Sequence, residues 1–290
     1  MPGAKHSILS GVVEFFKLIR ITNLAIVATT QFLIWRFQIT NDTSLHYFLF
    51  ESDTPLLLLG TVIIAASGYI INDYYDVKID VINKPDRVVI DRTLKRRKAF
   101  ILQWLLNAVA VGIGYYLGFP ILIVFIITIF LLWLYSNQLK RLPLVGNFAV
   151  SLATAFSILI LNLHTYQANM TVNVFALFAF FISLIREIIK DIEDKEGDEL
   201  HGCYTLPIVW GIRKTKFFLI LLILTFAGLV IFTTNLYTPN LFLPAVYGLS
   251  PVLILLIGFL IRADKKRHFD LLSSFCKIIM LLGITGIIFA

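Results

Sequence analysis

The sequence is short of the residues that a soluble protein presents to water. Only 15% of its 290 residues are charged, whereas 58% are hydrophobic, and the mean hydropathy is +0.85. Soluble domains have about 25% charged residues, so this composition excludes one. Cysteine is also scarce, because Cys203 and Cys276 are the only two. They provide neither a disulfide framework nor a metal-ligand pair. The chain is predicted to be an integral membrane protein.

The apolar runs also lack the alternation of apolar and polar residues that marks the strands of a transmembrane barrel. Several are long enough for a helix of about 20 residues to cross ~30 Å of hydrocarbon. We therefore predict an all-α, polytopic membrane protein that forms one domain over residues 1–290. The nine predicted transmembrane helices are residues 15–37, 55–71, 100–117, 121–135, 146–163, 172–189, 217–233, 241–261 and 271–289.

Lysine and arginine are missing from the loops after the third, fifth and seventh predicted spans, and they crowd the loops after the even-numbered ones. This asymmetry is the positive-inside pattern of membrane proteins. It predicts a multi-pass protein of the cell membrane with the N-terminus and the even-numbered loops in the cytoplasm and the C-terminus outside. The same pattern accounts for the net charge of +7, so the lipid bilayer, and no nucleic acid, is the expected partner of the basic residues.

An acidic segment follows the second predicted span in "GYIINDYYDVKIDVINKPDRVV", residues 68–89. Asn72, Asp76 and Asp80 are spaced at i, i+4 and i+8, which places them on one face of a continuing helix. Like charges at this spacing repel by roughly 0.2–0.5 kcal/mol per pair. Such a stripe is therefore unfavourable unless positive charge lies against it.

A second acidic segment follows the sixth predicted span in "FISLIREIIKDIEDKEGDELHGCYTLP". Asp191, Asp194 and Asp198 are spaced at i, i+3 and i+7, again on one helix face. Because the two segments end spans four apart, the chain is predicted to consist of two four-helix halves related as a repeat, plus a ninth helix. A single acidic helix end is often only a solvated cap, but ionisable groups at bilayer depth are usually functional.

Two facing carboxylate stripes can hold divalent cations. Mg²⁺ typically takes a few carboxylates, retains water molecules, and completes its coordination with phosphate oxygens of a substrate. The paired stripes therefore point to a ligand that carries phosphate.

The sequence "NDYYDVKID" matches the signature NDxxDxxxD, and "DIEDKEGD" matches DxxDxxGD. In both motifs, and over essentially its whole length, the chain resembles the UbiA superfamily of intramembrane prenyltransferases. The resemblance implies a bundle of nine helices around a central cavity, with Mg²⁺ and a polyprenyl diphosphate bound at its cytoplasmic mouth.

The resemblance also implies roles for individual residues. The expected metal ligands are Asn72, Asp73, Asp76, Asp80, Asp191, Asp194 and Asp198. The residues expected to be catalytic are Asp76, Asp191, Lys140 and Arg87. Those expected to bind substrate are Arg20, Asn23, Lys84, Tyr135, Arg141 and Lys190.

Two positions depart from the family pattern. Tyr and Lys are often separated by three residues on the fourth span, but here Leu139 stands in that place and Lys140 follows it. Either the helix end shifts, or Lys140 and Arg141 share the role. The Arg-Pro pair that often follows the first motif is Arg87-Val88 here.

The expected activity is Mg²⁺-dependent transfer of a prenyl group from its diphosphate to a lipophilic acceptor. The motifs look most like the branch of the family that transfers a geranylgeranyl group to geranylgeranylglyceryl phosphate. An aromatic quinone precursor of the 4-hydroxybenzoate or dihydroxynaphthoate type is the alternative acceptor. A transporter that uses the acidic residues as a path for ions or phosphate is the alternative outside enzymology.

Overall fold

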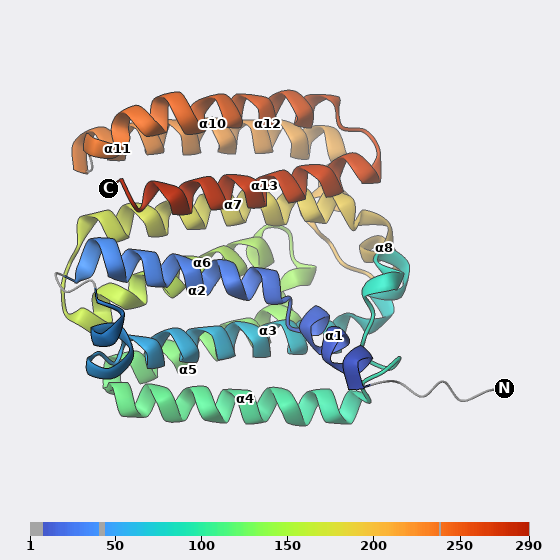
Figure 1. Ribbon diagram of the computed structural model, residues 1–290. Coiled ribbons are helices and arrows are strands. Elements are labelled where there is room, and N and C mark those ends of the chain that lie inside the picture. Colours follow the sequence, from blue (N-terminus) through green and yellow to red (C-terminus); the bar gives the residue numbers. More distant parts are fainter. Residues whose placement is uncertain (1–7, 41–43, 238, 290) are drawn as a thin grey trace.

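The computed structural model describes residues 8–40, 44–237 and 239–289. Apart from an isolated bridge between Ile90 and Leu94, its regular elements are helices, which run back and forth along one bundle (Figure 1). The α-helices are α1 (Ile8–Leu18), α2 (Ile21–Ile34), α3 (Thr54–Asn83), α4 (Arg96–Leu117), α5 (Phe119–Asn137), α6 (Val145–Thr165), α7 (Met170–Glu193), α8 (Lys195–Leu200), α9 (Leu206–Val209), α10 (Gly211–Tyr237), α11 (Pro239–Pro244), α12 (Ser250–Arg262) and α13 (Lys266–Gly286). The π-helices η1 (Trp35–Ile39), η2 (Tyr47–Glu51) and η5 (Ala245–Leu249) and the 3-10 turns η3 (Pro85–Arg87) and η4 (Leu139–Arg141) complete the list.

Seven helices of the described chain are long and apolar enough to span a membrane. They are α3, α4, α5, α6, α7, α10 and α13. Seven of the nine predicted spans thus coincide with such helices. At the other two, α2 and α12 have 14 and 13 residues, fewer than a span needs, although each adjoins a π-helix of five residues.

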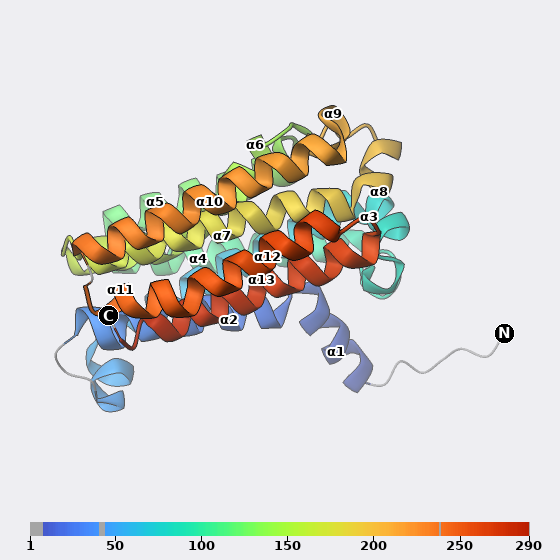
Figure 2. The same cartoon turned by 90° about the horizontal axis from the view of Figure 1, so that it is seen from above.

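The first predicted span, residues 15–37, is wrong in its boundaries. The helix breaks at Arg20, whose φ of 52° lies in the left-handed region. This break separates α1 from α2, and α1 turns away from the bundle axis (Figure 2). At this break the guanidinium of Arg20 meets the carboxylate of Asp73 on α3 at 2.9 Å, a contact between residues far apart in the chain.

Helices α3 and α7 are the most deeply enclosed spans, whereas α4 and α5 lie at the outside. Helix α7 packs against α6, α10 and α13, and its apolar residues from Ile182 to Ile192 belong to the largest hydrophobic cluster. A cap fixes its start, because the side-chain oxygen of Asn169 accepts hydrogen bonds from the backbone N–H groups of Thr171 and Val172. The two central helices are thus the ones that carry the two acidic motifs.

Candidate active site

The acidic ends of α3 and α7 lie at the same end of the bundle, next to α8 (Figure 2). Helix α3 continues to Asn83, so Asn72, Asp76 and Asp80 share one face as predicted. The continuous helical face predicted for the second motif is wrong, because α7 ends at Glu193 and Asp198 belongs to α8. The backbone N–H of Asp198 nevertheless bonds to the carbonyl of Asp194 at 3.2 Å. The chain therefore turns at Asp194 without moving Asp198 away from the site.

Four contacts of the Asn83 and Lys84 side chains join the two motifs. Asn83 at the end of α3 donates to the carbonyl oxygen of Asp194 at 2.9 Å and accepts from the backbone N–H of Gly197 at 3.0 Å. The ammonium group of Lys84 lies 2.7 Å from a carboxylate oxygen of Asp194 and 3.2 Å from one of Glu193. Two acidic segments more than a hundred residues apart are thereby fixed as one structure.

A polar cavity of about 630 Å³, which we term the mouth, opens between these segments. The predicted site residues that line it are Arg20, Asn23, Asn72, Asp73, Asp76, Asp80, Lys84, Tyr135, Lys140, Lys190, Asp191, Asp194 and Asp198. Residues from α2, α3, α5, α7 and α8 therefore contribute to a single cavity.

Each motif in the mouth is met by a cation or an amide. Lys140 forms an ion pair with Asp76, Arg20 forms one with Asp73 at 2.9 Å, and Asn147 donates to Asp191 at 2.8 Å. Lys140 and Arg20 supply positive charge that the first carboxylate stripe requires, and Asn147 supplies a hydrogen bond to the second. Asn147 was not among the predicted residues.

The structure shows how Lys140 reaches the site although it comes one residue later than in the family pattern. Helix α5 ends at Asn137, and the following turn η4 directs Lys140 itself to Asp76. The side chain of Arg141 is exposed and lies outside the lining of the described cavities, so the suggested sharing of the role is not seen. The side chain of Arg87 lies outside the described part of the structure.

The residues of the mouth fit a magnesium ion, although they do not form a closed ligand cage. Among the described residues no three His, Cys, Asp or Glu side chains converge as a metal site would require. Two buried oxygens, Oδ1 of Asn72 and Oδ1 of Asp194, have no hydrogen-bond partner within the described chain. Buried polar atoms normally have one. Because Mg²⁺ uses few protein ligands and completes its shell with water and phosphate, these oxygens suit it.

The pKa values of charged groups outside the spans reflect the close packing of carboxylates in the mouth. Burial raises the pKa of Asp198 to about 7, and the charges of Asp194 and Asp76 add to the increase. Burial by itself would lower the pKa of Lys84, but the adjacent Asp194 and Glu193 carboxylates raise it above its usual value. The carboxyl group of Asp198 thus has too little positive charge nearby to offset its burial, whereas the carboxylates beside Lys84 hold its ammonium group in the charged form.

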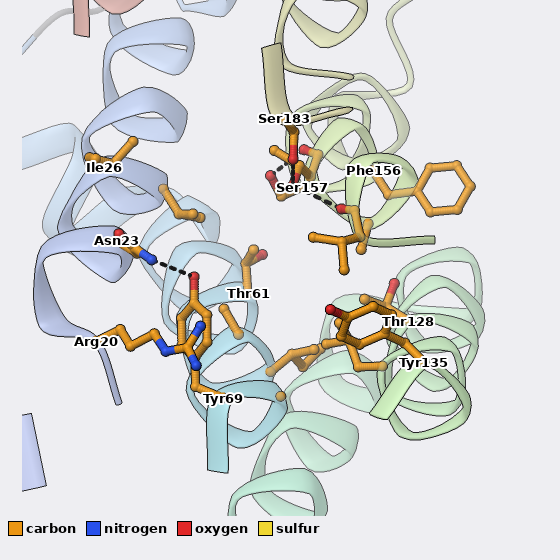
Figure 3. Close-up of a pocket in the computed structure, with 18 of the residues that line it drawn as sticks. Arg20, Asn23, Ile26, Thr61, Tyr69, Thr128, Tyr135, Phe156, Ser157 and Ser183 are labelled. Carbon is orange, nitrogen blue, oxygen red and sulfur yellow. Dashed lines mark hydrogen bonds between the residues drawn. The ribbon is translucent and has the colours of Figure 1, made fainter. Parts of the chain in front are cut away.

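An apolar cavity of about 220 Å³, which we term the chamber, continues from the mouth between α2, α3, α5, α6 and α7 (Figure 3). Asn23 lies at its edge and donates to the hydroxyl of Tyr69 at 3.2 Å. A third cavity of about 90 Å³ shares Ile26, Ser157 and Met280 with the chamber and extends it toward the far end of α13. The arrangement can therefore hold a polar head group with an apolar chain behind it.

Sequence reasoning missed three charged residues that line both the mouth and the chamber: Arg186, Glu187 and Lys277. Each is an ionisable residue inside an otherwise apolar span. That feature by itself is a signal of function in membrane proteins and could have identified them.

The chain is similar to known proteins over most of its length. The model of the UbiA prenyltransferase family matches residues 46–280. The digeranylgeranylglyceryl phosphate synthase of Korarchaeum cryptofilum is 31% identical over 264 residues, which cover 86% of this chain and 88% of that protein. The synthase of the same name from Sulfolobus acidocaldarius is 35% identical over 246 residues, which cover 85% and 82%.

Solved structures share the fold. One, from a study of digeranylgeranylglyceryl phosphate synthase in membranes, has a TM-score of 0.65 and 25% identity, and the match covers 96% of this chain and 98% of that one. A UbiA homologue from Archaeoglobus fulgidus bound to GPP and Mg²⁺ has a TM-score of 0.60 and 14% identity, with 94% and 99% covered. The two solved structures thus match nearly the whole chain.

Proposed function

Because the chain belongs to the UbiA prenyltransferase family, we propose that it transfers a geranylgeranyl group from its diphosphate to geranylgeranylglyceryl phosphate in a Mg²⁺-dependent reaction. The observation that carries this proposal is the junction of the mouth with the chamber. Acidic and basic side chains line the first, whereas the second has a mainly apolar wall beyond the charged residues that both cavities share. A prenyl diphosphate has the same division into a charged head and an apolar chain.

Bound Mg²⁺ would supply positive charge to the diphosphate oxygens and so assist their departure. Asp76, Asp191, Asn72 and Asp194 are the residues proposed to hold it, with Asp73, Asp80 and Asp198 close by. The Archaeoglobus homologue, which binds Mg²⁺ and GPP, supports the choice of metal and donor class.

Lys140, Lys84 and Arg20 have a second role in the proposal. They form ion pairs with the carboxylates of the mouth in the protein alone, and they can contact the diphosphate when it binds between the motifs. Such contacts stabilise the negative charge that develops on the leaving oxygen. The bond between C1 and this oxygen breaks, a bond forms between C1 and the hydroxyl oxygen of the acceptor, and the hydroxyl proton leaves toward the polar mouth. The apolar chamber keeps water from C1.

The names of the relatives support a glycerol phosphate lipid as acceptor, because both synthases cover most of this chain. An aromatic quinone precursor is the alternative. The family and these relatives favour an enzyme over the ion or phosphate transporter.

We further propose that α2 with η1 and α12 with η5 complete nine membrane passes around the chamber, in two four-helix halves plus α13. The mouth then faces the cytoplasm, as the distribution of lysine and arginine predicts. The carboxyl end of α13 lies at the opposite end of the bundle, which supports a C-terminus outside (Figure 1).

The acceptor is tested by incubating the purified enzyme with Mg²⁺ and geranylgeranyl diphosphate plus each acceptor in turn. Mass spectrometry identifies the products. The proposal predicts a product with two geranylgeranyl groups from geranylgeranylglyceryl phosphate. If only 4-hydroxybenzoate or dihydroxynaphthoate is prenylated, the acceptor is wrong, although the family assignment stands.

A further inference from the structure

The mouth and the chamber meet at a ring of shared lining residues, which we term the neck. The neck consists of Arg20, Asn23, Asn72, Tyr135, Arg186, Glu187, Lys190 and Lys277. Arg20 and Tyr135 mark its two sides in Figure 3. Every member is polar, and Glu187 is the only acid among them. The neck is thus the most cation-rich part of the wall at the depth where the polar mouth ends.

The carboxylate of Glu187 forms ion pairs with two cations of its own helix. It lies 2.7 Å from a guanidinium nitrogen of Arg186 and 3.1 Å from the ammonium of Lys190. All three side chains are largely enclosed, with exposed fractions of 15% for Arg186, 21% for Lys190 and 9% for Glu187. The Nε atom of Arg186 is buried and has no hydrogen-bond partner within the described chain. One carboxylate therefore does not satisfy the donors around it.

Helix α13 adds a third cation. It packs against α7, as both views show (Figures 1 and 2). Lys277, Met280, Ile284 and Ile287 follow one another at intervals of three or four residues, and all four line the chain of cavities. This face of α13 is thus directed inward and places Lys277 in the wall of the neck.

The charges of the neck identify the kind of ligand that suits it. Arg186, Lys190 and Lys277 are three cations in the wall of the neck, and Glu187 is the one acid among the residues that line it. The buried Nε of Arg186 still needs an acceptor, which a bound anion can supply. A phosphate monoester carries about −1.5 to −2 at neutral pH and offers several acceptor oxygens, whereas the carboxylate of an aromatic acid carries only one charge.

Two neck residues, Asn72 and Arg20, already belong to the proposed metal and donor site, so the role concerns only the other cations of the neck, Arg186, Lys190 and Lys277. The carboxylates and cations suited to Mg²⁺ and diphosphate lie in the mouth, on the ends of α3, α5, α7 and α8. In a glycerol phosphate the free hydroxyl lies only a few bonds from the phosphate. A phosphate at the neck therefore places the hydroxyl at the boundary where C1 of a donor must lie if its head is in the mouth and its chain in the chamber.

We propose that Arg186, Lys190 and Lys277 bind the phosphate group of the acceptor. This inference rests on the proposed function, because it names the residues that would recognise a phosphate-bearing acceptor. It adds that the acceptor is selected by its phosphate at the neck and not by contacts to its chain.

The test measures binding separately from turnover. Full-length enzyme in nanodiscs, without donor, is titrated with geranylgeranylglyceryl phosphate and with geranylgeranylglycerol, which lacks the phosphate. We expect the wild type to prefer the phosphate lipid, and Lys277→Gln and Arg186→Gln to reduce the preference by about ten- to a hundredfold, the range typical of charged hydrogen bonds. Lys277→Arg keeps the positive charge and should restore the preference for the phosphate lipid. Lys214→Gln, an exposed position of α10 outside the cavities, is the matched control for lost charge.

A second titration measures the affinity of the same variants for geranylgeranyl diphosphate with Mg²⁺. The inference requires this affinity to change much less than that for the phosphate lipid. It is overturned if the neck variants lose both ligands equally, if they keep the wild-type preference, or if the wild type itself does not distinguish the two lipids. Binding of the phosphate lipid at the neck without any prenylation of it would leave this inference standing and refute the proposed function.

Discussion

The side chain of Asn83 lies directly against the backbone of Gly197, whose N–H donates a hydrogen bond of 3.0 Å to the amide oxygen of Asn83. A Cβ atom at Gly197 would lie 2.5 Å from both the nitrogen and the oxygen of the Asn83 amide. The glycine of the second acidic motif is therefore what allows α8 to pack on the end of α3. This contact, and the ion pairs of Lys84, hold the two halves of the mouth together.

Gly197→Ala is expected to disturb this packing. The added methyl group forces the Asn83 amide to move, and overpacking of this kind costs roughly 1–3 kcal/mol. We expect a lower unfolding temperature in detergent and a turnover number reduced by about tenfold or more. Gly228→Ala is the control, because nothing lies within 4 Å of a Cβ at that position in α10. Equal behaviour of the two variants would show that the contact is unimportant.

Lys140 and Arg141 are adjacent in the chain but differ in their surroundings. Lys140 pairs with Asp76 inside the mouth, whereas the side chain of Arg141 is exposed. We expect Lys140→Gln to lower kcat/KM for the donor by about ten- to a hundredfold, the usual effect of losing a charged hydrogen bond. Arg141→Gln should change it little. A larger loss for Arg141→Gln, measured under the same conditions, would contradict the assignment made at this turn.

We expect the third cavity to limit the length of the prenyl chain. Gly283 on α13 lines it, and a Cβ there would meet nothing within 4 Å. Gly283→Leu fills this space, so the enzyme should favour farnesyl over geranylgeranyl diphosphate by about tenfold relative to the wild type, since each displaced methylene is worth ~0.8 kcal/mol. Competition between the two donors measures the ratio. Gly258→Leu, on an exposed face of α12, should leave the ratio unchanged. An identical shift in both variants would refute the role of the cavity.

The orientation in the membrane can be tested with introduced cysteines. Cys203 is a poor probe because it is 3% exposed, and burial together with Asp198 raises the pKa of its thiol to about 11. Glu199→Cys on α8 and Tyr166→Cys, after α6, are exposed positions at opposite ends of the bundle (Figure 1). With both native cysteines replaced by serine, an impermeant reagent added to intact cells should label position 166 and not position 199. Labelling of position 199 alone would reverse the topology.

Much of the fold could be predicted from composition alone, because lipid imposes long apolar helices. The two acidic motifs also predicted a shared site, since their helical spacing is visible in the sequence. Long-range packing was not visible. Nothing local indicates that Lys84 meets Asp194, or that the chain turns at Arg20 to meet Asp73. The eighth span was predicted as one segment, yet α12 has only 13 residues after a π-helix.

The neck shows a different limit. Arg186 and Lys277 lie in different spans, and only the packing of α13 on α7 brings them to one cavity. A single charged residue in an apolar run can be noticed in a sequence, but its neighbours depend on which helix faces it. The charge of the neck, and therefore the ligand it suits, could be read only from the assembled bundle.

We propose that the acidic ends of α3 and α7 act together as a Mg²⁺-dependent prenyl transfer site. The most direct measurement is the rate of prenylated product formed by wild type, Asp76→Asn and Asp191→Asn, each with Mg²⁺ and again with EDTA. Each substitution removes one carboxylate charge while keeping the shape of the side chain, so the variants should insert and purify normally. We expect product only from the wild type with Mg²⁺. Full activity in EDTA, or in either variant, would contradict it.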